Sequence, residues 1–424
     1  MEEITIAGID EVINYFVCDN GLKVYIWVNE KVSSTMMSLY VKYGSVDTEF
    51  TVNNAHFSVP NGTAHFLEHV KFNEGKNFTA HDFYSKTGAD VNAFTTFDYT
   101  SYYVHAIDNI EENLTHLLDF VQIPYFTSSL IQKEKGIIKE EEKMGEDNPS
   151  TVHYFGIFKN LFCESRYRNI ITGRINDIKS TTLKDIESAF VNFYHPKNMA
   201  LFITGNVNPH ELKMIINDNQ NSKVFNDFQN PVVDVPKEKL KVNVDFQEVE
   251  GNVAIPKLKY GIKISKKKFK KYNDFDIRLM INLLLSINFG STSDLKEYLI
   301  QNHLATYLHA DCDIYDDYII IIISTETKFP NDVLKLIVDK LENLEISKET
   351  FERKLKAIIA TYILNYDDIE KVNMLMQDDF ANYNEVLSDT KKRYENLKYN
   401  EIIELKELLT FDNHTTFILK PKKN

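Results

Sequence analysis

The chain has 424 residues, 43% hydrophobic and 26% charged, which is the composition of an ordinary globular protein long enough for two domains. Its formal net charge of −14 argues against a nucleic-acid-binding protein and against docking on an anionic membrane. The start, Met1-Glu2-Glu3, is acidic where a signal peptide would be basic, and the longest apolar run, Tyr318 to Ile323, is too short to cross a membrane. We expect the three scattered cysteines to be packed thiols in a reducing, cytoplasmic compartment, since they are Cys18, Cys163 and Cys312 with no C-x-x-C pair.

In the first half of the chain, β-branched and alternating segments predict strands, whereas apolar residues at helical spacing predict helices. The expected strands cover residues 22–28, 35–41, 91–98, 100–106 and 199–204. The expected helices, besides one around residues 65–69, cover residues 80–87, 110–121, 128–144 and 183–193.

The composition changes over residues 217–256, where Asn, Gln, Lys, Asp and Pro dominate, and this predicts an interdomain linker that can include the first strand of a second half. After it, the order of strands and helices recurs, which indicates a weak internal duplication. The predicted division is therefore a first half at 1–216, a linker at 217–256 and a second half at 257–424. The expected elements of the second half are strands within 258–264, 310–324 and 415–419 and helices at 275–287, 332–344 and 348–366.

The strongest chemical signal is His65-Phe66-Leu67-Glu68-His69. On a helix, His65 and His69 lie one turn apart and can reach one metal ion, with Glu68 close enough to polarise a water molecule on that ion. This H-x-x-E-H order is the reverse of the H-E-x-x-H zinc motif. The alternative interpretation is a surface helix with hydrogen-bonded histidines, but Phe66, Leu67 and Val70 make the neighbourhood apolar.

A catalytic zinc site needs a third protein ligand, and the helix expected at 128–144 can supply it. Glu134 and Glu141 lie two turns apart within its apolar stripe, whose members are Leu130, Ile131, Ile137, Ile138 and Met144. We choose Glu141 as the ligand and Glu134 as support for a ligating histidine, because buried carboxylates must be paired or metal-bound. Glu140 and Glu142 are expected to be solvated, and an acidic surface helix remains the alternative.

Together these motifs make the chain resemble the pitrilysin, insulin-degrading and mitochondrial-processing peptidase family of inverted zincins, and within it the short two-domain bacterial members. The resemblance is dense over the first 210 residues or so and otherwise rests on length and element order. Beyond His65–His69 and Glu134-x6-Glu141, the matching residues are Gly88-Ala89-x-x-Asn92-Ala93-x-Thr95, Ile171-x-Gly173 and Phe193-Tyr194-His195-Pro196-x-Asn198-Met199.

The resemblance implies an α+β fold of two similar halves, each an antiparallel sheet covered by helices, closing over a short or unfolded peptide. It implies a zinc endopeptidase in which His65, His69 and Glu141 bind Zn²⁺, Glu68 is the general base and Glu134 supports the site. The strand with Asn92, Ala93 and Phe94 would be an edge strand that pairs with the substrate backbone.

One departure concerns the second half, where family members carry an arginine and, seven residues later, a tyrosine that hold the substrate. Here the tyrosine is Tyr307 and the arginine position holds Ile300, with Lys296 out of register. The resemblance therefore implies a catalytic subunit that works with a homologous partner carrying the Arg/Tyr pair, in a heterodimer or else as a homodimer. The alternative is a peptide-binding, non-catalytic subunit.

Overall fold

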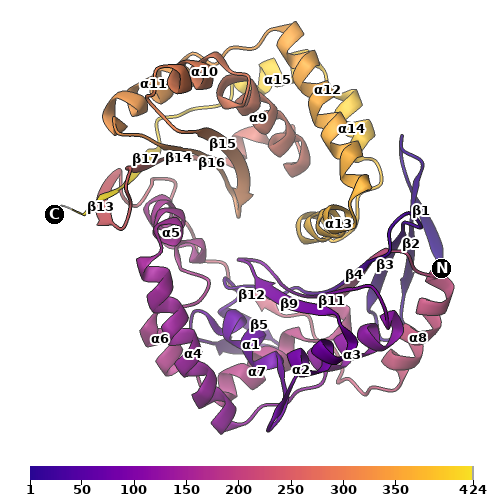
Figure 1. The fold of residues 1–424 in the computed structure, drawn as a ribbon. Coiled ribbons are helices and arrows are strands. Elements are labelled where there is room, and N and C mark those ends of the chain that lie inside the picture. Colours follow the sequence, from indigo (N-terminus) through magenta and orange to yellow (C-terminus); the bar gives the residue numbers. More distant parts are fainter. Residues whose placement is uncertain (423–424) are drawn as a thin grey trace. The chain divides into compact units, whose positions relative to one another are not determined.

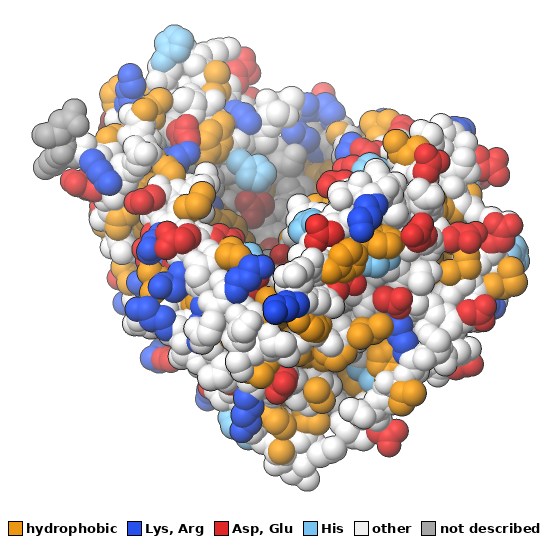
Figure 2. Space-filling model, turned by 60° about the horizontal axis from the view of Figure 1, so that its bottom comes forward, with side chains coloured by type: hydrophobic (Ala, Val, Ile, Leu, Met, Phe, Trp, Pro, Cys, Tyr) orange, Lys and Arg blue, Asp and Glu red, His pale blue; other side chains and the backbone are white. Residues whose placement is uncertain are grey.

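The computed structural model describes residues 1–422, and these form two compact units, each made from separate stretches of the chain (Figure 1). No helix among the described residues has the length and apolar character to span a bilayer. On the face in Figure 2, acidic, basic and apolar side chains are mixed rather than gathered by kind. Unit 1 comprises Met1–Glu142, Ile170–Asp234 and Thr361–Lys392, and unit 2 comprises Lys143–Asn169, Val235–Ala360 and Arg393–Asn424.

Unit 1 is built on a seven-stranded sheet in the order β1-β2-β3-β11-β4-β10-β9. Neighbouring strands are antiparallel except β11 and β3, which are parallel. A three-stranded sheet of β12, β5 and β6 and a short pair, β7 and β8, accompany it. The strands are β1 Glu2–Ile6, β2 Glu11–Val17, β3 Lys23–Val28, β4 Thr35–Val41, β5 Glu49–Val52, β6 Ala55–Ser58, β7 Asn73–Gly75, β8 Phe78–Thr79, β9 Asp90–Thr95, β10 Thr100–Ala106, β11 Met199–Gly205 and β12 Val232–Val233.

One face of this sheet forms the main core of unit 1, because residues such as Leu39, Tyr102 and Ile203 are fully buried there beneath helices. Phe66 and Leu117 supply apolar side chains from α1 and α3 to the same core. Apart from α5 (Pro149–Leu161), which belongs to unit 2, the helices from the first half are α1 Thr63–Lys71, α2 Ala80–Thr87, α3 Ile110–Gln122, α4 Ser128–Asp147, α6 Ile175–Ser180, α7 Leu183–Phe193 and α8 Pro209–Asn221.

The opposite face of the same sheet is covered by α13 (Ile369–Tyr383), a helix from the second half of the chain (Figure 1). The Phe380 ring packs against three aromatic side chains of the sheet, Tyr25, Tyr40 and Phe202. The fully buried Asn373 side chain accepts a hydrogen bond from the Ser38 hydroxyl at 2.7 Å. Residues far apart in sequence therefore complete unit 1.

Unit 2 is built on a five-stranded sheet in the order β13-β17-β14-β16-β15, antiparallel except for the parallel pair β13 and β17. Its strands are β13 Phe246–Gly251, β14 Lys257–Ser265, β15 Leu308–Tyr315, β16 Tyr318–Glu326 and β17 His414–Pro421. The other helices of the second half are α9 Asp274–Phe289, α10 Asp294–Gln301, α11 Pro330–Glu342, α12 Lys348–Leu364, α14 Thr390–Asn396 and α15 Tyr399–Lys406.

The two sheets share one plan, which confirms the prediction of two similar α+β halves. Numbered in chain order, the five strands β3, β4, β9, β10 and β11 lie in the spatial order 1-5-2-4-3, and β13 to β17 lie in the same order. In both sheets, strands 1 and 5 form the only parallel pair among the described strands. β13 lies within residues 217–256, the predicted linker, which the prediction allowed to include a first strand of the second half.

Each half of the chain supplies one helix to the unit built mainly from the other half. As α13 covers a face of the sheet in unit 1, so α5 (Pro149–Leu161), from the first half, covers one face of the sheet in unit 2. A Cβ atom on Gly156 would lie 2.4 Å from the Phe417 ring on β17, so the missing side chain permits this close approach. Asn148 caps the start of α5, accepting hydrogen bonds from the amides of Ser150 and Thr151. The sequence prediction included neither α5 nor α13.

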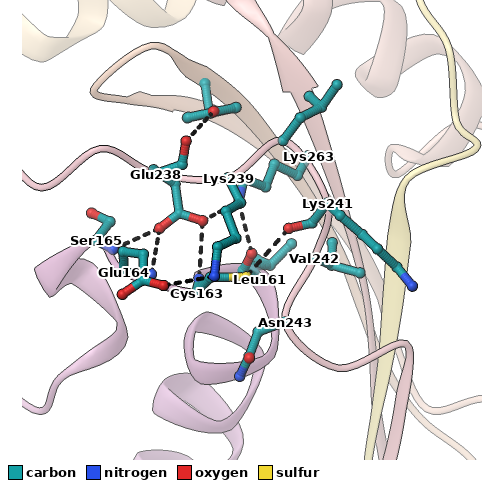
Figure 3. A network of polar contacts seen from close by, with 12 residues as sticks. Leu161, Cys163, Glu164, Ser165, Glu238, Lys239, Lys241, Val242, Asn243 and Lys263 are labelled. Atoms are coloured by element: carbon teal, nitrogen blue, oxygen red, sulfur yellow. Dashed lines mark hydrogen bonds and ion pairs between the residues drawn. The ribbon is translucent and has the colours of Figure 1, made fainter.

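The buried carboxylate of Glu238 binds the backbone that directly follows α5 (Figure 3). Glu238, within the predicted linker, accepts hydrogen bonds from the successive amides of Cys163, Glu164 and Ser165 at 2.6–3.0 Å. It also accepts one from Lys263 Nζ at 2.6 Å, and the two side chains are 2% and 0% exposed. Burial alone would raise the pKa of Glu238, but Lys263 and the amides lower it overall. This part of the linker is therefore an ordered element of unit 2.

Candidate metal centre

The short helix α1 carries the H-x-x-E-H residues and is buried on nearly all sides. It begins after Gly62, whose φ of 82° lies in the left-handed region that glycine tolerates best. A Cβ on Gly62 would lie 2.3 Å from the Thr172 carbonyl oxygen, and one on Gly173 would lie 2.4 Å from the Asn61 carbonyl oxygen. The two glycines thus allow the loop around residue 172 to pack against the start of α1.

Three predicted ligands converge on one point in unit 1. His65 Nε2 lies 3.5 Å from one carboxylate oxygen of Glu141, and His69 Nε2 lies 3.2 Å from the other. One donor atom from each residue lies within 4.8 Å of the other two, and the two imidazole centroids are 4.6 Å apart. Two imidazole nitrogens and a carboxylate oxygen are the donor set of a catalytic zinc site with one position left for water.

Helix α4, which supplies Glu141, is rotated relative to the predicted stripe. Ile137 and Met144 were expected to be buried, but their side chains are 46% and 73% exposed. Glu142 was expected to be solvated and is instead 3% exposed, so that part of the prediction was wrong. The buried side of α4 follows an i, i+4 series rather than the wider stripe, and its buried members are Leu130, Ile131, Glu134, Ile138 and Glu142.

Glu142 is buried because the loop that follows the short 3₁₀ helix η1 (Arg166–Arg168) supplies partners for its charge. Its carboxylate accepts a hydrogen bond from Thr172 Oγ1 at 2.9 Å and one from Arg174 at 3.0 Å. These residues flank Gly173, so one loop contacts both the start of α1 and the end of the α4 segment in unit 1. With Glu142 directed toward this loop, Glu141, one residue earlier, is directed toward the histidines.

Glu134 lies two turns before Glu141 and is 3% exposed. One of its oxygens is 3.8 Å from His69 Nδ1, the ring nitrogen on the side away from Glu141. The other accepts a hydrogen bond from Asn73 Nδ2 at 3.4 Å. A carboxylate in this place orients an imidazole and makes its other nitrogen a better metal ligand.

Glu68 is 8% exposed and is held by a residue to which the sequence analysis gave no role. Thr95 Oγ1, on β9, donates a hydrogen bond to Glu68 Oε2 at 2.5 Å, and Thr100 Oγ1 lies 3.2 Å from Thr95 Oγ1. Thr95 is the last residue of the Gly88-Ala89-x-x-Asn92-Ala93-x-Thr95 motif. Its place in that motif is the sequence signal that could have identified it as a partner of Glu68.

The charges around the two imidazoles fit a divalent cation. Glu68, Glu134 and Glu141 bring three carboxylates together, and the nearby Lys133 is 62% exposed. The contacts with His65 and His69 hold the pKa of the Glu141 carboxyl well below its usual range. Burial lowers the pKa of His69, but Glu134 and Glu141 outweigh this and raise it to about 9. A metal ion would take the place of the His69 proton, since a ligating imidazole must be neutral.

The predicted substrate-binding residues of the first half lie on β9, which is one of the two edge strands of the seven-stranded sheet. β9 pairs with β10 on one side, with Asn92 opposite Tyr103, Ala93 opposite Tyr102 and Phe94 opposite Ser101. Its other side forms no ladder with any strand that the structure describes. An extended peptide can add to such an edge through main-chain hydrogen bonds.

The predicted residues of the second half belong to unit 2. Tyr307 directly precedes β15, the edge strand that corresponds to β9, and burial raises the pKa of its hydroxyl. Ile300, at the arginine position, is 39% exposed on α10. The Lys296 ammonium donates to the Leu308 carbonyl oxygen at 3.0 Å, so it has a structural contact.

Comparison with known proteins agrees with this architecture. The family described as Insulinase (Peptidase family M16) matches residues 25–171, and the Peptidase M16 inactive domain matches residues 180–358. The uncharacterized zinc protease YmfH of Bacillus subtilis is 38% identical over 304 residues, 71% of each chain. The crystal structure of a candidate M16-like peptidase from Alicyclobacillus acidocaldarius superposes with a TM-score of 0.92 at 24% identity, covering 99% of this chain and 100% of that one. A protease from Helicobacter pylori gives 0.82 at 22% identity, covering 96% and 99%.

Proposed function

The chain belongs to peptidase family M16, and we propose that it is a zinc-dependent endopeptidase for short or unfolded peptides. The observation that carries the proposal is the convergence of His65, His69 and Glu141 within 4.8 Å, with the buried Glu68 carboxylate on the same helix. Relatives that bear the name zinc protease support the metal assignment.

Zn²⁺ bound by the two imidazoles and Glu141 would lower the pKa of a water molecule toward neutrality and polarise a peptide carbonyl. Glu68 is placed to take the proton from that water and to pass it to the leaving amine. The Thr95 hydroxyl occupies one oxygen of Glu68 and leaves the other free for this exchange. Asn92, Ala93 and Phe94 would hold the substrate backbone along β9.

The test is the Glu68→Gln variant. It keeps all three ligands and the Thr95 contact but removes the base, so zinc content should stay at the wild-type level. Hydrolysis of a quenched fluorescent peptide should fall by about 10²–10⁴-fold. Glu112→Gln, an exposed change on α3, is the matched control. Near-normal hydrolysis by the Glu68 variant would refute the mechanism, and a zinc-free wild-type chain would refute the metal assignment.

We further propose that this chain is the zinc-bearing subunit of a heterodimer. The support is Ile300 at the position where the family carries arginine, because a developing oxyanion needs donors and losing one costs about 10²–10³-fold in rate. The partner would be a chain of similar length without H-x-x-E-H but with the Arg/Tyr pair. Hydrolysis should be slow for the purified chain and rise when that partner is added. If the chain alone hydrolyses the peptide at full rate, and Tyr307→Phe abolishes that hydrolysis, then no partner subunit is needed and the heterodimer proposal fails.

The alternative is a non-catalytic, peptide-binding subunit. The complete set of Glu68, His65, His69 and Glu141 argues against it, because a binding subunit has no need of a base beside a metal site. Peptide binding without hydrolysis, by the zinc-loaded chain both alone and with its partner, would favour this alternative.

A further inference from the structure

We propose that unit 2 contains a carboxylate-binding site, formed by Lys259, Ser324 and His153 where α5 crosses the sheet. The inference rests on the proposed function in one respect, that the carboxylate belongs to a peptide. Every residue that forms this site belongs to unit 2, whereas the metal-centre residues belong to unit 1.

The floor of the site is one transverse row of the five-stranded sheet. Lys259 on β14 lies opposite Ser324 on β16, and Ser324 lies opposite His309 on β15. Residues directly opposite in adjacent strands point to the same face. The next row on that face contains Lys257 opposite Glu326.

A cavity of about 600 Å³ lies over this row, and α5 forms its wall. His153 and Tyr154 come from the helix, while Lys259, His309 and Ser324 come from the strands. The Lys259 ammonium lies 5.2 Å from the centre of the Tyr154 ring. The helix and the sheet thus present one charged and several polar groups to a common space.

Lys259 differs from its neighbours on β14 in lacking a counter-ion. Lys257 forms an ion pair with Glu326, and Lys263 forms one with Glu238. The Lys259 ammonium forms no ion pair or hydrogen bond with any residue in the described part of the chain, although the Asp311 charge acts on it from a distance. Asp311 instead lies 3.5 Å from His309.

The second unpartnered group is the imidazole of His153. It is 5% exposed, and its Nε2 atom is buried without a hydrogen-bond partner among residues 1–422. Burial, and then the charges of Lys259 and Lys257, lower the pKa of His153 to about 3, so the ring is neutral. A neutral imidazole can donate one N–H, and a buried polar atom without a partner costs about 1–3 kcal/mol unless a ligand supplies one.

One cation, one imidazole N–H and one hydroxyl match a single carboxylate, which accepts several hydrogen bonds and carries one charge. A phosphate dianion fits less well, because it would bring two charges to one unpaired ammonium with Asp311 nearby. In a peptide the carboxylate is either the C-terminal group or an Asp or Glu side chain.

The experiment measures peptide binding to the full chain by calorimetry, with a chelator present so that no peptide is hydrolysed. One peptide pair differs only in a free or amidated C-terminus, and a second pair differs only in Glu or Gln. We expect the acid member of one pair to bind about tenfold more tightly, as for a charged hydrogen bond. Which pair shows the preference identifies the source of the carboxylate.

Lys259→Met should abolish the preference, and Lys259→Arg should retain it. Lys348→Met, which removes an exposed lysine paired with Glu352, is the matched control and should retain it as well. An unchanged preference in Lys259→Met, no preference in the wild type, or tighter binding of inorganic phosphate than of acetate would each overturn the proposal.

A second measurement covers the case in which Lys259→Met does not fold. The ¹⁵N signal of His153, assigned by its loss in His153→Gln, should move when the acid peptide is added to the wild-type chain. A signal that stays in place would overturn the proposal. Neither the calorimetry nor the ¹⁵N measurement depends on zinc binding or hydrolysis. The carboxylate site can therefore be confirmed if the proposed peptidase function fails, and it can be refuted if that function is confirmed.

Discussion

Replacing Arg174 by Met tests whether the loop next to α1 sets the position of the third ligand. Arg174 donates a hydrogen bond to the buried Glu142 carboxylate, one residue after the predicted ligand Glu141. We expect the substitution to lower both the stability of the chain and its affinity for zinc, although the three predicted ligands are unchanged.

The size of the effect follows from the exposure of the two partners. The Glu142 side chain is 3% exposed and the Arg174 side chain is 54% exposed, so water screens one side of the ion pair. The full Coulomb energy of a buried pair is therefore not available, and the value for a charged hydrogen bond, about 1.5–3 kcal/mol, applies. Thr172 remains as one partner of the carboxylate, which limits the loss. Loss of a residue that orients metal ligands costs about 10–100-fold in metal affinity.

The assay combines thermal unfolding of the metal-free chain with zinc affinity from competition against a chromophoric chelator. Lys135→Met is the matched control, because Lys135 is a cation on α4 that donates to the Lys179 carbonyl oxygen and not to Glu142. It should leave zinc affinity within about twofold of the wild type. Arg174→Lys should recover part of the affinity.

The double change Glu142→Leu with Arg174→Met separates charge from geometry, because an apolar pair of similar volume can replace a buried ion pair without loss of stability. Zinc affinity should then recover with stability. If Arg174→Met lowers stability but leaves zinc affinity at the wild-type value, the loop does not position Glu141 and the reasoning fails.

Three further predictions concern single side chains. Glu141→Gln should lose zinc or bind it far more weakly, measured by elemental analysis, and full occupancy would mean that Glu134 or Glu146 is the ligand instead. His153 has a pKa of about 3 in the folded chain and about 6.5 when unfolded, so the unfolded state binds the extra proton as pH falls. The wild-type chain should lose roughly 2 kcal/mol between pH 6.5 and 5 relative to His153→Gln in denaturant unfolding, and equal losses would refute this. Glu238→Gln should destabilise unit 2 by about 3–5 kcal/mol, because the Lys263 ammonium would be buried without a charge partner. The exposed Glu164→Gln is its control, and equal unfolding midpoints would contradict the prediction.

The sequence was sufficient for the parts of the site that depend on local geometry. His65, Glu68 and His69 occupy one helix, so their spacing alone brings them together. Glu141 required a second helix, and the two-turn spacing from Glu134 identified it although the predicted stripe was out of phase. The phase was wrong because Glu142 is buried against Arg174, 32 residues later, and no helical period contains that information.

Two of the helices that escaped prediction, α5 and α13, cover the sheet of the opposite half. Their sheet-facing sides carry polar residues, His153 on α5 and Asn373 and Gln377 on α13, all of them buried. These residues interrupt the apolar periodicity by which a helix is recognised. Their partners are distant in sequence: the Asn373 side chain meets Ser38, 335 residues away. Only the folded chain shows that such polar residues face a core.

Because α5 and α13 are exchanged, each half of the chain depends on the other for a complete core. The aromatic face formed by Tyr25, Tyr40 and Phe202 is covered by α13, so the first half cannot bury it without the second. A scaffold alone, however, would be served best by an apolar face beneath α5, because unpaired buried polar groups destabilise a fold. Among residues 1–422, the interface between α5 and the sheet instead holds Lys259 without a counter-ion and His153 Nε2 without a hydrogen-bond partner. These unpaired polar groups are the ones that the carboxylate site proposed for unit 2 would use.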